Sequence, residues 1–329
     1  MRYKGTFLLI FTAIVGFSCF FYFRSHTDVA AIHAIRIPVH FLTADHIPVI
    51  DLTIDGQRCS LLLDSGTYNL GLRQEVLERV QHKEPAGSVE SFDIHGHRYL
   101  SPRFTLQSSI HIGHLKLTGV PIQEESLEFV LKGSRLWPSD TINPKTKKTL
   151  EHLSGKVGGA ILLPFNCLFD FPHSAFYLAK NREELKKLKK GCLDGFIEVP
   201  LDLQKNGILI SIETDLGMKK FLLDTGADTS VLKRSLIDPS QAEEFAPGKW
   251  SYTSHKFMIG NQDFGDWDFV LFEFPEHLTV DGILGIDFFR QYAVALDFEN
   301  KTVFIEPPHQ PLLSRMIDAC VDFFYSTTR

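Results

Sequence analysis

The chain has 329 residues, of which 44% are hydrophobic and 22% are charged, and its formal net charge is −6. This composition is typical of a soluble domain carrying an attached segment, and its mild acidity gives no indication of nucleic-acid binding. Lysines gather at 145–148 and 186–190, but acidic and polar neighbours make these solvated faces and not a binding patch. A globular part of about 300 residues is long enough for two hydrophobic cores.

Residues 5–23 form an almost uninterrupted apolar run, preceded by Arg2 and Lys4 and followed by Arg24. A helix of these 19 residues can cross the hydrocarbon core of a bilayer. We therefore expect residues 1–24 to form a single N-terminal membrane anchor. The positive charges before the span predict a cytoplasmic N-terminus, with the rest of the chain on the periplasmic or extracytoplasmic side.

A second interpretation of the apolar run is a signal peptide cleaved near Val29-Ala30-Ala31, which would give a secreted protein. The run is longer than a usual signal core, which favours the anchor, and residues 25–35 then form a tether. Cys19 is a poor candidate for lipid attachment because Gly16-Phe17-Ser18 matches a lipobox badly.

Four cysteines follow the apolar run, namely Cys59, Cys167, Cys192 and Cys320. An even number in an exported chain permits disulfides, but the sequence does not select among the three possible pairings. Free buried thiols are the alternative. No cysteine spacing indicates a metal site.

An acid stands at the end of an apolar run in Leu61-Leu62-Leu63-Asp64-Ser65-Gly66-Thr67. A buried strand that ends in such a turn places a carboxylate where loss of water can shift its pKa. The glycine allows backbone N–H groups to approach the carboxylate closely. An alternating run at 49–54 and the turn Asp55-Gly56 precede this segment and predict a strand before it.

The same arrangement recurs 160 residues later, in Phe221-Leu222-Leu223-Asp224-Thr225-Gly226-Ala227. The resemblance between the two halves continues on both sides of the acids. The further matched segments are 49–54 with 208–212, Gly158–Leu162 with Asp281–Gly285, Phe169-Asp170-Phe171 with Leu296-Asp297-Phe298, and the short strands 175–178 with 302–305. These matches indicate an internal duplication, which predicts two carboxylates facing each other across a pseudo-twofold axis.

With an Asp-Ser/Thr-Gly segment and a later hydrophobic-hydrophobic-Gly segment in each half, the chain resembles the two-lobed aspartic proteases. The small halves are most similar to bacterial retropepsin-like domains in tandem, over residues 36–306. The resemblance implies an all-β, bilobal pepsin/retropepsin-like fold with pseudo-twofold symmetry, after one transmembrane helix. Its parts are the first lobe at 36–180, a connector at 181–195, the second lobe at 196–306, and a tail at 307–329 with a short amphipathic helix.

The resemblance also implies which residues form the site. Asp64 and Asp224 are the expected catalytic pair, and the residues that support the two loops are Ser65, Gly66, Thr67, Thr225, Gly226 and Ala227. By the same resemblance, the hydroxyls of Ser65 and Thr225 lock the loops to each other. The first half departs from the pattern at Ser65, where threonine is usual, and at Leu162, where Gly285 of the second half predicts a glycine.

Residues Val89 to Leu100 predict a hairpin with His95-Gly96-His97 at its tip and Tyr99 on the returning strand. The resemblance makes His95, Gly96 and Tyr99 part of a flap that closes over substrate, and we expect its tip to be exposed. The alternative is an ordinary surface hairpin. The corresponding segment of the second half is expected at Ser251–Ile259, which lacks a central glycine. We therefore expect one flap.

Two carboxylates held close together cannot both ionise cheaply, so they share one proton and activate a water between them. The sequence thus predicts an aspartic endopeptidase with a polypeptide substrate, no cofactor and no metal, active as a monomer. The alternatives are an inactive retropepsin-like peptide-binding module of the cell envelope and a structural envelope protein. The residue three positions after each acid also differs, being Thr67 in the first half and Ala227 in the second. A hydrogen bond donated by the Thr67 hydroxyl would favour the negative charge on Asp64, so the shared proton is expected on Asp224.

Overall fold

The computed structural model describes residues 34–42, 47–126, 136, 144–188, 193–204 and 207–308. The expected anchor at 5–23, almost all of the tether, the tail helix, and Cys19, Cys192 and Cys320 lie outside these residues. No helix in the described residues is long and apolar enough to cross a membrane. Within them, Cys59 and Cys167 are buried free thiols, as the second interpretation of the cysteines expected.

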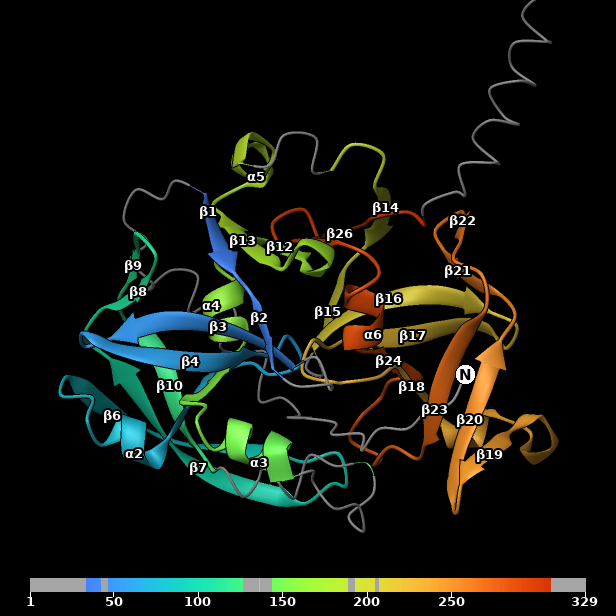
Figure 1. Cartoon of the computed structure of the whole chain (residues 1–329), viewed down its shortest axis with the longest axis horizontal. Coiled ribbons are helices and arrows are strands. Elements are labelled where there is room, and N and C mark those ends of the chain that lie inside the picture. The colour runs from blue at the N-terminus through green and yellow to red at the C-terminus, as the bar shows by residue number, and fades with distance from the viewer. Residues whose placement is uncertain are drawn as a thin grey trace, which may run out of the picture.

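Alternating apolar residues build two ten-stranded sheets of identical topology, one in each half (Figure 1). In β3 of the first half, Ile50, Leu52 and Ile54 are buried in the core, and in β16 of the second half Ile208, Ile210 and Ile212 repeat this pattern. The halves are therefore two lobes of one mostly β fold, as the duplication predicted.

The strands of the first lobe follow the order β6-β7-β10-β5-β11-β4-β3-β8-β9, and β2 pairs with β3. Their bounds are β2 His40–Leu42, β3 Ile47–Ile54, β4 Gln57–Leu63, β5 Leu70–Arg73, β6 Lys83–Phe92, β7 Arg98–Leu106, β8 Ile110–Ile112, β9 Leu115–Leu117, β10 Val120–Glu125 and β11 Gly155–Val157. The second lobe has the order β19-β20-β23-β18-β24-β17-β16-β21-β22, and β15 pairs with β16. Its strands are β15 Asp202–Gln204, β16 Gly207–Thr214, β17 Gly217–Leu223, β18 Val231–Lys233, β19 Glu243–Ala246, β20 Lys249–Ser254, β21 Phe257–Ile259, β22 Gln262–Asp263, β23 Trp267–Phe272 and β24 Gly282–Leu284.

A third, six-stranded sheet joins the lobes, and it lies at the top of Figure 1. Its order is β1 (Ile35–Pro38), β13 (Ala175–Ala179), β12 (Asn166–Asp170), β25 (Val294–Asp297), β26 (Thr302–Ile305) and β14 (Ile197–Pro200). The central pair, β12 with β25, brings together the matched segments at 169–171 and 296–298, with Phe169 opposite Val294. Each half thus contributes three strands to one continuous sheet.

The helices are short and lie between strands. They are α2 Gln74–Leu77, α3 Pro144–Leu150, α4 Gly159–Leu162, α5 Arg182–Leu188 and α6 Ile286–Phe289, with 3-10 turns at Phe171–His173, Arg234–Leu236 and Pro239–Gln241. Helix α5 occupies the predicted connector, and Asn181 caps its first turn, because Asn181 Oδ1 accepts a hydrogen bond from the Glu184 N–H at 2.9 Å.

The strand register corrects the predicted match between Leu162 and Gly285. Val157 pairs with Leu63 in the first lobe, and Leu284 pairs with Leu223 in the second, so Gly158 is the counterpart of Gly285. The prediction was wrong because it aligned the apolar residues of α4 with those of β24. The first lobe therefore keeps its glycine, and Leu162 is no departure from the pattern.

The register also corrects the hairpins. In the first lobe β6 and β7 form a longer hairpin than Val89–Leu100. Its counterpart in the second lobe is formed by β19 and β20, not by Ser251–Ile259, and Gly248 lies in its turn with a φ of 71°. This second hairpin is short, because β19 has 4 residues where β6 has 10.

Candidate active site

Each motif acid follows directly on a strand that has a parallel neighbour. The Asp64 N–H donates to the Val157 carbonyl at 2.9 Å, and the Asp224 N–H donates to the Leu284 carbonyl at 3.0 Å. Apolar strands thus carry both carboxyls into the interior, where Asp64 is 0% exposed and Asp224 is 1% exposed. The matched acids occupy equivalent places in the two lobes.

The hydroxyls after the two acids bind the loops to each other across the pseudo-twofold axis. Ser65 Oγ donates to the Leu223 carbonyl at 2.9 Å, and Thr225 Oγ1 donates to the Leu63 carbonyl at 2.7 Å. Each hydroxyl also accepts the backbone N–H of the other residue, in both cases at 3.0 Å. The predicted interlock is confirmed, and the serine performs the same bonding as the threonine.

The two glycines permit a close approach of the acids. The Gly66 N–H donates to Asp64 Oδ1 at 3.0 Å, and the Gly226 N–H donates to Asp224 Oδ1 at 2.8 Å. A Cβ at Gly66 would lie 2.4 Å from Asp224 Cγ, well inside van der Waals contact. The Asp224 carboxyl therefore lies directly against the loop of Asp64, and only glycine leaves it that space.

Burial raises the pKa of Asp224 well above its ordinary value, and the neighbouring charge of Asp64 raises this pKa further. The Gly226 N–H favours the charged form but does not outweigh these effects. Asp224 Oδ2 is buried and accepts no hydrogen bond from any described residue. Burial and the neighbouring carboxylate therefore favour a protonated Asp224 beside Asp64.

Equivalent backbone hydrogen bonds support the acid loops of both lobes. The Gly159 N–H donates to the Thr67 carbonyl at 2.9 Å, and the Ile286 N–H donates to the Ala227 carbonyl at 2.7 Å. A Cβ at Gly158 would lie 2.3 Å from the Thr67 carbonyl oxygen, so this position requires glycine. Thr67 and Ala227 are buried here as parts of equivalent loops.

Sequence reasoning missed Asp287, which supports only the second loop. Its Oδ1 accepts from Ser230 Oγ and its Oδ2 from the Ser230 N–H, both at 2.8 Å. Burial raises the pKa of Asp287 to about 6 despite these bonds. The position of Asp287, two residues after Gly285, could have indicated this role. The first lobe has Ala160 at the equivalent position, so a comparison of the two halves did not reveal Asp287.

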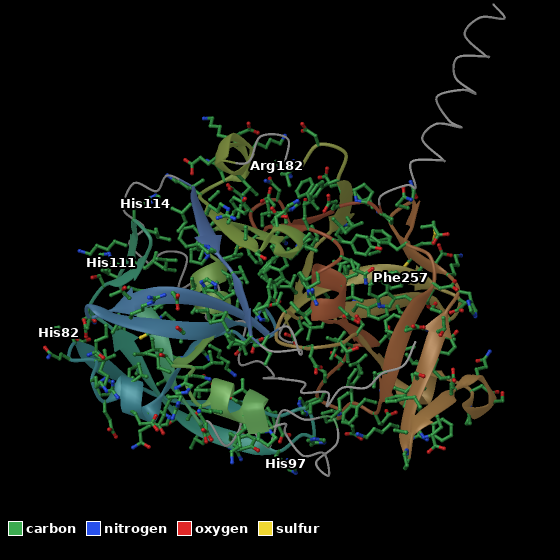
Figure 2. All side chains as sticks on the ribbon, in the orientation of Figure 1. His82, His97, His111, His114, Arg182 and Phe257 are labelled. Atoms are coloured by element: carbon green, nitrogen blue, oxygen red, sulfur yellow. The ribbon has the colours of Figure 1, made fainter. Side chains whose placement is uncertain are left out.

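The β6–β7 hairpin reaches the second lobe, and the expected exposure of its tip holds only in part. Ile94 is buried and His95 and Gly96 are half-buried, whereas the His97 side chain is 69% exposed. Buried Asp93 shapes the tip, because it accepts from the His95 and His97 N–H groups at 2.9 and 2.8 Å and from the Tyr99 hydroxyl at 3.1 Å. His97 lies at the lower edge of Figure 2, on this hairpin. The sequence pattern pointed to the tip residues but not to the acid that organises them.

The neighbouring tip residues touch the loop between β23 and β24. Ile94 is 2% exposed within a cluster that includes Phe274 and Leu278. The rings of His95 and Phe272 meet edge to face at a centroid distance of 5.6 Å. The hairpin therefore bridges the two lobes, and a surface hairpin with a free tip is the wrong description.

The comparisons with known proteins agree with this architecture. No family model matches the sequence, and no curated protein matches it. Among solved structures, an aspartic proteinase from Irpex lacteus matches with a TM-score of 0.51 and 12% identity, covering 84% of this chain and 97% of that chain. Basic 7S globulin from soybean matches with a TM-score of 0.51 and 11% identity, covering 84% of this chain and 95% of that chain. The chain has the two-lobed fold of the pepsin-like aspartic proteinases.

Proposed function

We propose that the protein is an aspartic endopeptidase that hydrolyses peptide bonds with a water activated by Asp64 and Asp224. The observation that carries this proposal is the pair of buried carboxyls on interlocked loops, with the pKa of Asp224 raised. Asp64 removes a proton from the water as it attacks the carbonyl carbon of the substrate. Protonated Asp224 donates to the oxygen on which negative charge develops. Both acids come from one chain, so the active form is a monomer.

The test is cleavage of a peptide library by purified protein and by Asp64→Asn and Asp224→Asn variants. Each variant loses one of the two required protonation states, so cleavage should stop in both. Near-UV circular dichroism should stay unchanged, which shows that the lobes still pack. Cleavage that persists in pure Asp224→Asn protein would contradict the two-acid mechanism. Inhibition by pepstatin would support it, but insensitivity would decide little because the cleft alone determines whether that inhibitor fits.

A second candidate is a peptide-binding module without hydrolysis. It is favoured by the match to Basic 7S globulin, which is named as a globulin and not as a proteinase. This candidate predicts peptides bound at the cleft and released intact. Mass spectrometry of the peptides after prolonged incubation separates the two candidates, since only the endopeptidase yields fragments.

We also propose that residues 5–23 anchor the protein in a membrane, with its N-terminus in the cytoplasm and its lobes outside it. The apolar run and the charges of Arg2 and Lys4 support this topology. Protease added to intact cells or spheroplasts should then degrade the lobes. Protection of the lobes until the membrane is lysed would reverse the orientation, and soluble protein that starts near Val29 would favour secretion.

A further inference from the structure

The outer half of the β6–β7 hairpin is an arm that leaves the sheet of the first lobe. Strand β7 pairs with β10 only at residues 103–106. From Ser88 to Pro102 the two strands of the hairpin pair only with each other, in the part of the chain that the structure describes. We call residues 88–102 the arm. Because a two-stranded hairpin alone is marginally stable, side-chain packing must hold the arm in its observed position.

The tip of the arm is docked on the second lobe, against the loop of residues 273–281 between β23 and β24. A Cβ at Gly96 would lie 3.2 Å from Pro275 Cβ and 3.7 Å from His277 Cε1. The centroids of the Phe92 and His277 rings lie 4.7 Å apart. Together with the contacts of the tip described above, these hold the arm across the boundary between the lobes.

The docked tip helps to cover the apolar wall of the second lobe beside Asp224. Leu222 lies two residues before Asp224, so its side chain belongs to the same face of the sheet. Leu222 is only 2% exposed. The residues of the tip and of the loop that share its buried cluster are Ile94, Phe274, Leu278 and Val280. While the arm is docked, a peptide cannot reach this wall.

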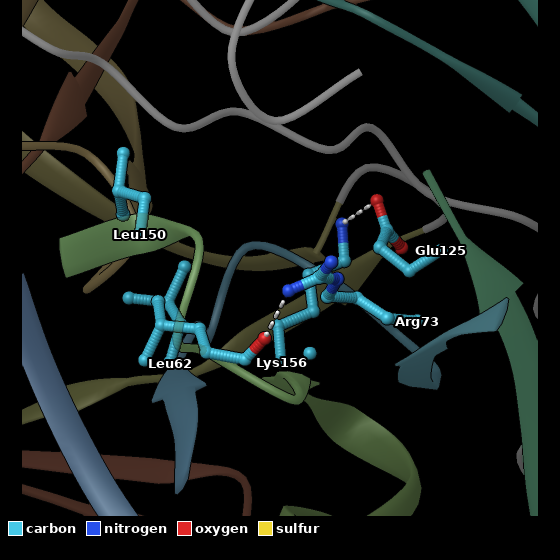
Figure 3. A pocket seen from close by; sticks show the side chains of 7 residues that line it. Leu62, Arg73, Glu125, Leu150 and Lys156 are labelled. Carbon is cyan, nitrogen blue, oxygen red and sulfur yellow. Dashed lines mark hydrogen bonds and ion pairs between the residues drawn. The ribbon is translucent and has the colours of Figure 1, made fainter. Parts of the chain in front are cut away.

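The corresponding face of the first lobe is filled from within. By the strand registers, Lys156 and Glu125 occupy the positions of Ile283 and Phe272. Lys156 Nζ lies 3.2 Å from Glu125 Oε1, and their side chains are 1% and 5% exposed (Figure 3). The cavity beside this pair has a volume of about 20 Å³, which is room for about one water. Neither matched face thus admits a substrate side chain in this arrangement, and the arm is the part that can leave.

We propose that the docked arm is an autoinhibitory lid, and that its tip must leave residues 273–281 before a peptide can reach the two acids. The inference rests on the proposed endopeptidase function. The closed state is stabilised by contacts within the chain and requires no substrate. A ligand that binds only open molecules has its apparent affinity reduced by the fraction that is open. The contacts of the tip therefore control how tightly every peptide binds.

A disulfide tests the lid, because it can hold the tip on the loop. In a variant that combines Gly96→Cys with Pro275→Cys, the Cβ atoms would start 3.2 Å apart. Disulfides join Cβ atoms that are about 3.5–4.5 Å apart, so a small shift allows the bond. The full-length variant is oxidised with glutathione disulfide, and mass spectrometry of linked peptides locates the bond. Cleavage of a peptide library is then measured before and after reduction with dithiothreitol, so the effect of the substitutions themselves cancels.

We expect the oxidised variant to cleave at least about tenfold more slowly than the same protein after reduction. The control combines Gly87→Cys with Pro275→Cys. Gly87 lies on the same hairpin with a φ of 87°, close to the 85° of Gly96, and a Cβ there would meet nothing within 4 Å. This control should form no bond to residue 275, and reduction should not change its cleavage. A bonded Gly96 variant that cleaves as fast as its reduced form would overturn the lid, and so would failure of the bond to form.

The same variant separates the lid from the proposed function. Absence of cleavage by the native protein and by the reduced variant would reject the endopeptidase and not the lid. Binding of a fluorescein-labelled peptide library, followed by fluorescence polarisation, then measures access to the cleft. Weaker binding by the oxidised variant than by the reduced one would support the lid, and equal binding would overturn it.

Ile94→Ser tests the lid if the cysteine variants do not fold. The substitution removes the apolar contact of the tip, so more molecules are open and KM should fall about tenfold. The measured quantity is KM, which reports admission of the substrate, because kcat also depends on how the tip closes over bound peptide. Leu100→Ser is the control, since Leu100 is 67% exposed on the same hairpin and its loss should leave KM unchanged. A KM that is unchanged or higher in Ile94→Ser protein would overturn the lid.

Discussion

Replacing Thr225 by valine tests whether the interlock holds the two lobes in their active arrangement. Valine has nearly the shape of threonine but cannot donate to the Leu63 carbonyl or accept from the Ser65 N–H. Both of these backbone groups are buried, and a buried group left without a partner costs about 1–3 kcal/mol. The two losses together should lower the free energy of unfolding by roughly 2–6 kcal/mol.

Urea unfolding followed by tryptophan fluorescence measures this difference. Thr225→Ser is the matched control, since Ser65 makes the same bonds in the first lobe. This control removes only a methyl group and should cost about 1 kcal/mol. If valine and serine destabilise the protein equally, the hydrogen bonds of the interlock contribute little and the reasoning fails.

Three further predictions concern the loops and the hairpin. Thr67→Ala removes a hydroxyl from the loop of Asp64, so the charged Asp64 carboxylate should lose a hydrogen-bond donor. The acid limb of the pH–rate profile should then move to higher pH. An unmoved limb would reject the assignment of the negative charge to Asp64. Gly96→Val should slow turnover and lower the melting temperature, because φ is 85° and a Cβ would meet Pro275 Cβ at 3.2 Å. Gly87→Val, with a φ of 87° and no neighbour within 4 Å, should cost similar stability but leave turnover unchanged, and equal kinetics for both would argue against a flap. Asp287 has a pKa raised from 3.8 to about 6, so its contribution to stability is complete below pH 3.8 and is lost as the pH rises through 6. Asp287→Asn should remove this pH-dependent change in the free energy of unfolding, which amounts to at most about 3 kcal/mol because part of the side chain reaches solvent. An unchanged dependence on pH would assign the titration to another group.

The paired acids and the duplicated sheets followed from the sequence because they depend on local patterns, whereas the interlock was implied by the resemblance to the aspartic proteases. An apolar run that ends in an acid, a hydroxyl and a glycine contains most of the information that places Asp64 and Asp224. The hydrogen bonds between the loops required only that the two segments face each other. The acids and the strands that carry them recur in each half, so comparing the halves was sufficient to find them.

The features that were missed depend on partners far away in the chain. Lys156 interrupts the strand Gly155–Val157, so its sequence does not show the apolar pattern of β24 in the second lobe. The apolar residues of α4 resemble β24 more closely in sequence, and the prediction aligned them with it. Lys156 is tolerated there only because Glu125 comes from another strand and Gly71 leaves room for both. The burial of the hairpin tip likewise depends on residues such as Pro275, which no local pattern of the hairpin contains.

The six-stranded sheet has a consequence for how the halves depend on the peptide chain between them. Its central ladder, β12 with β25, is formed by backbone hydrogen bonds and involves no residue of the connector. Two separate polypeptides, cut within residues 189–192, would still have complementary strand edges and a common core, so they should assemble as a heterodimer. Either fragment alone would expose an unpaired edge strand, which other chains can join. In that sense each half is a subunit, and the connector mainly guarantees that the two are present in equal numbers.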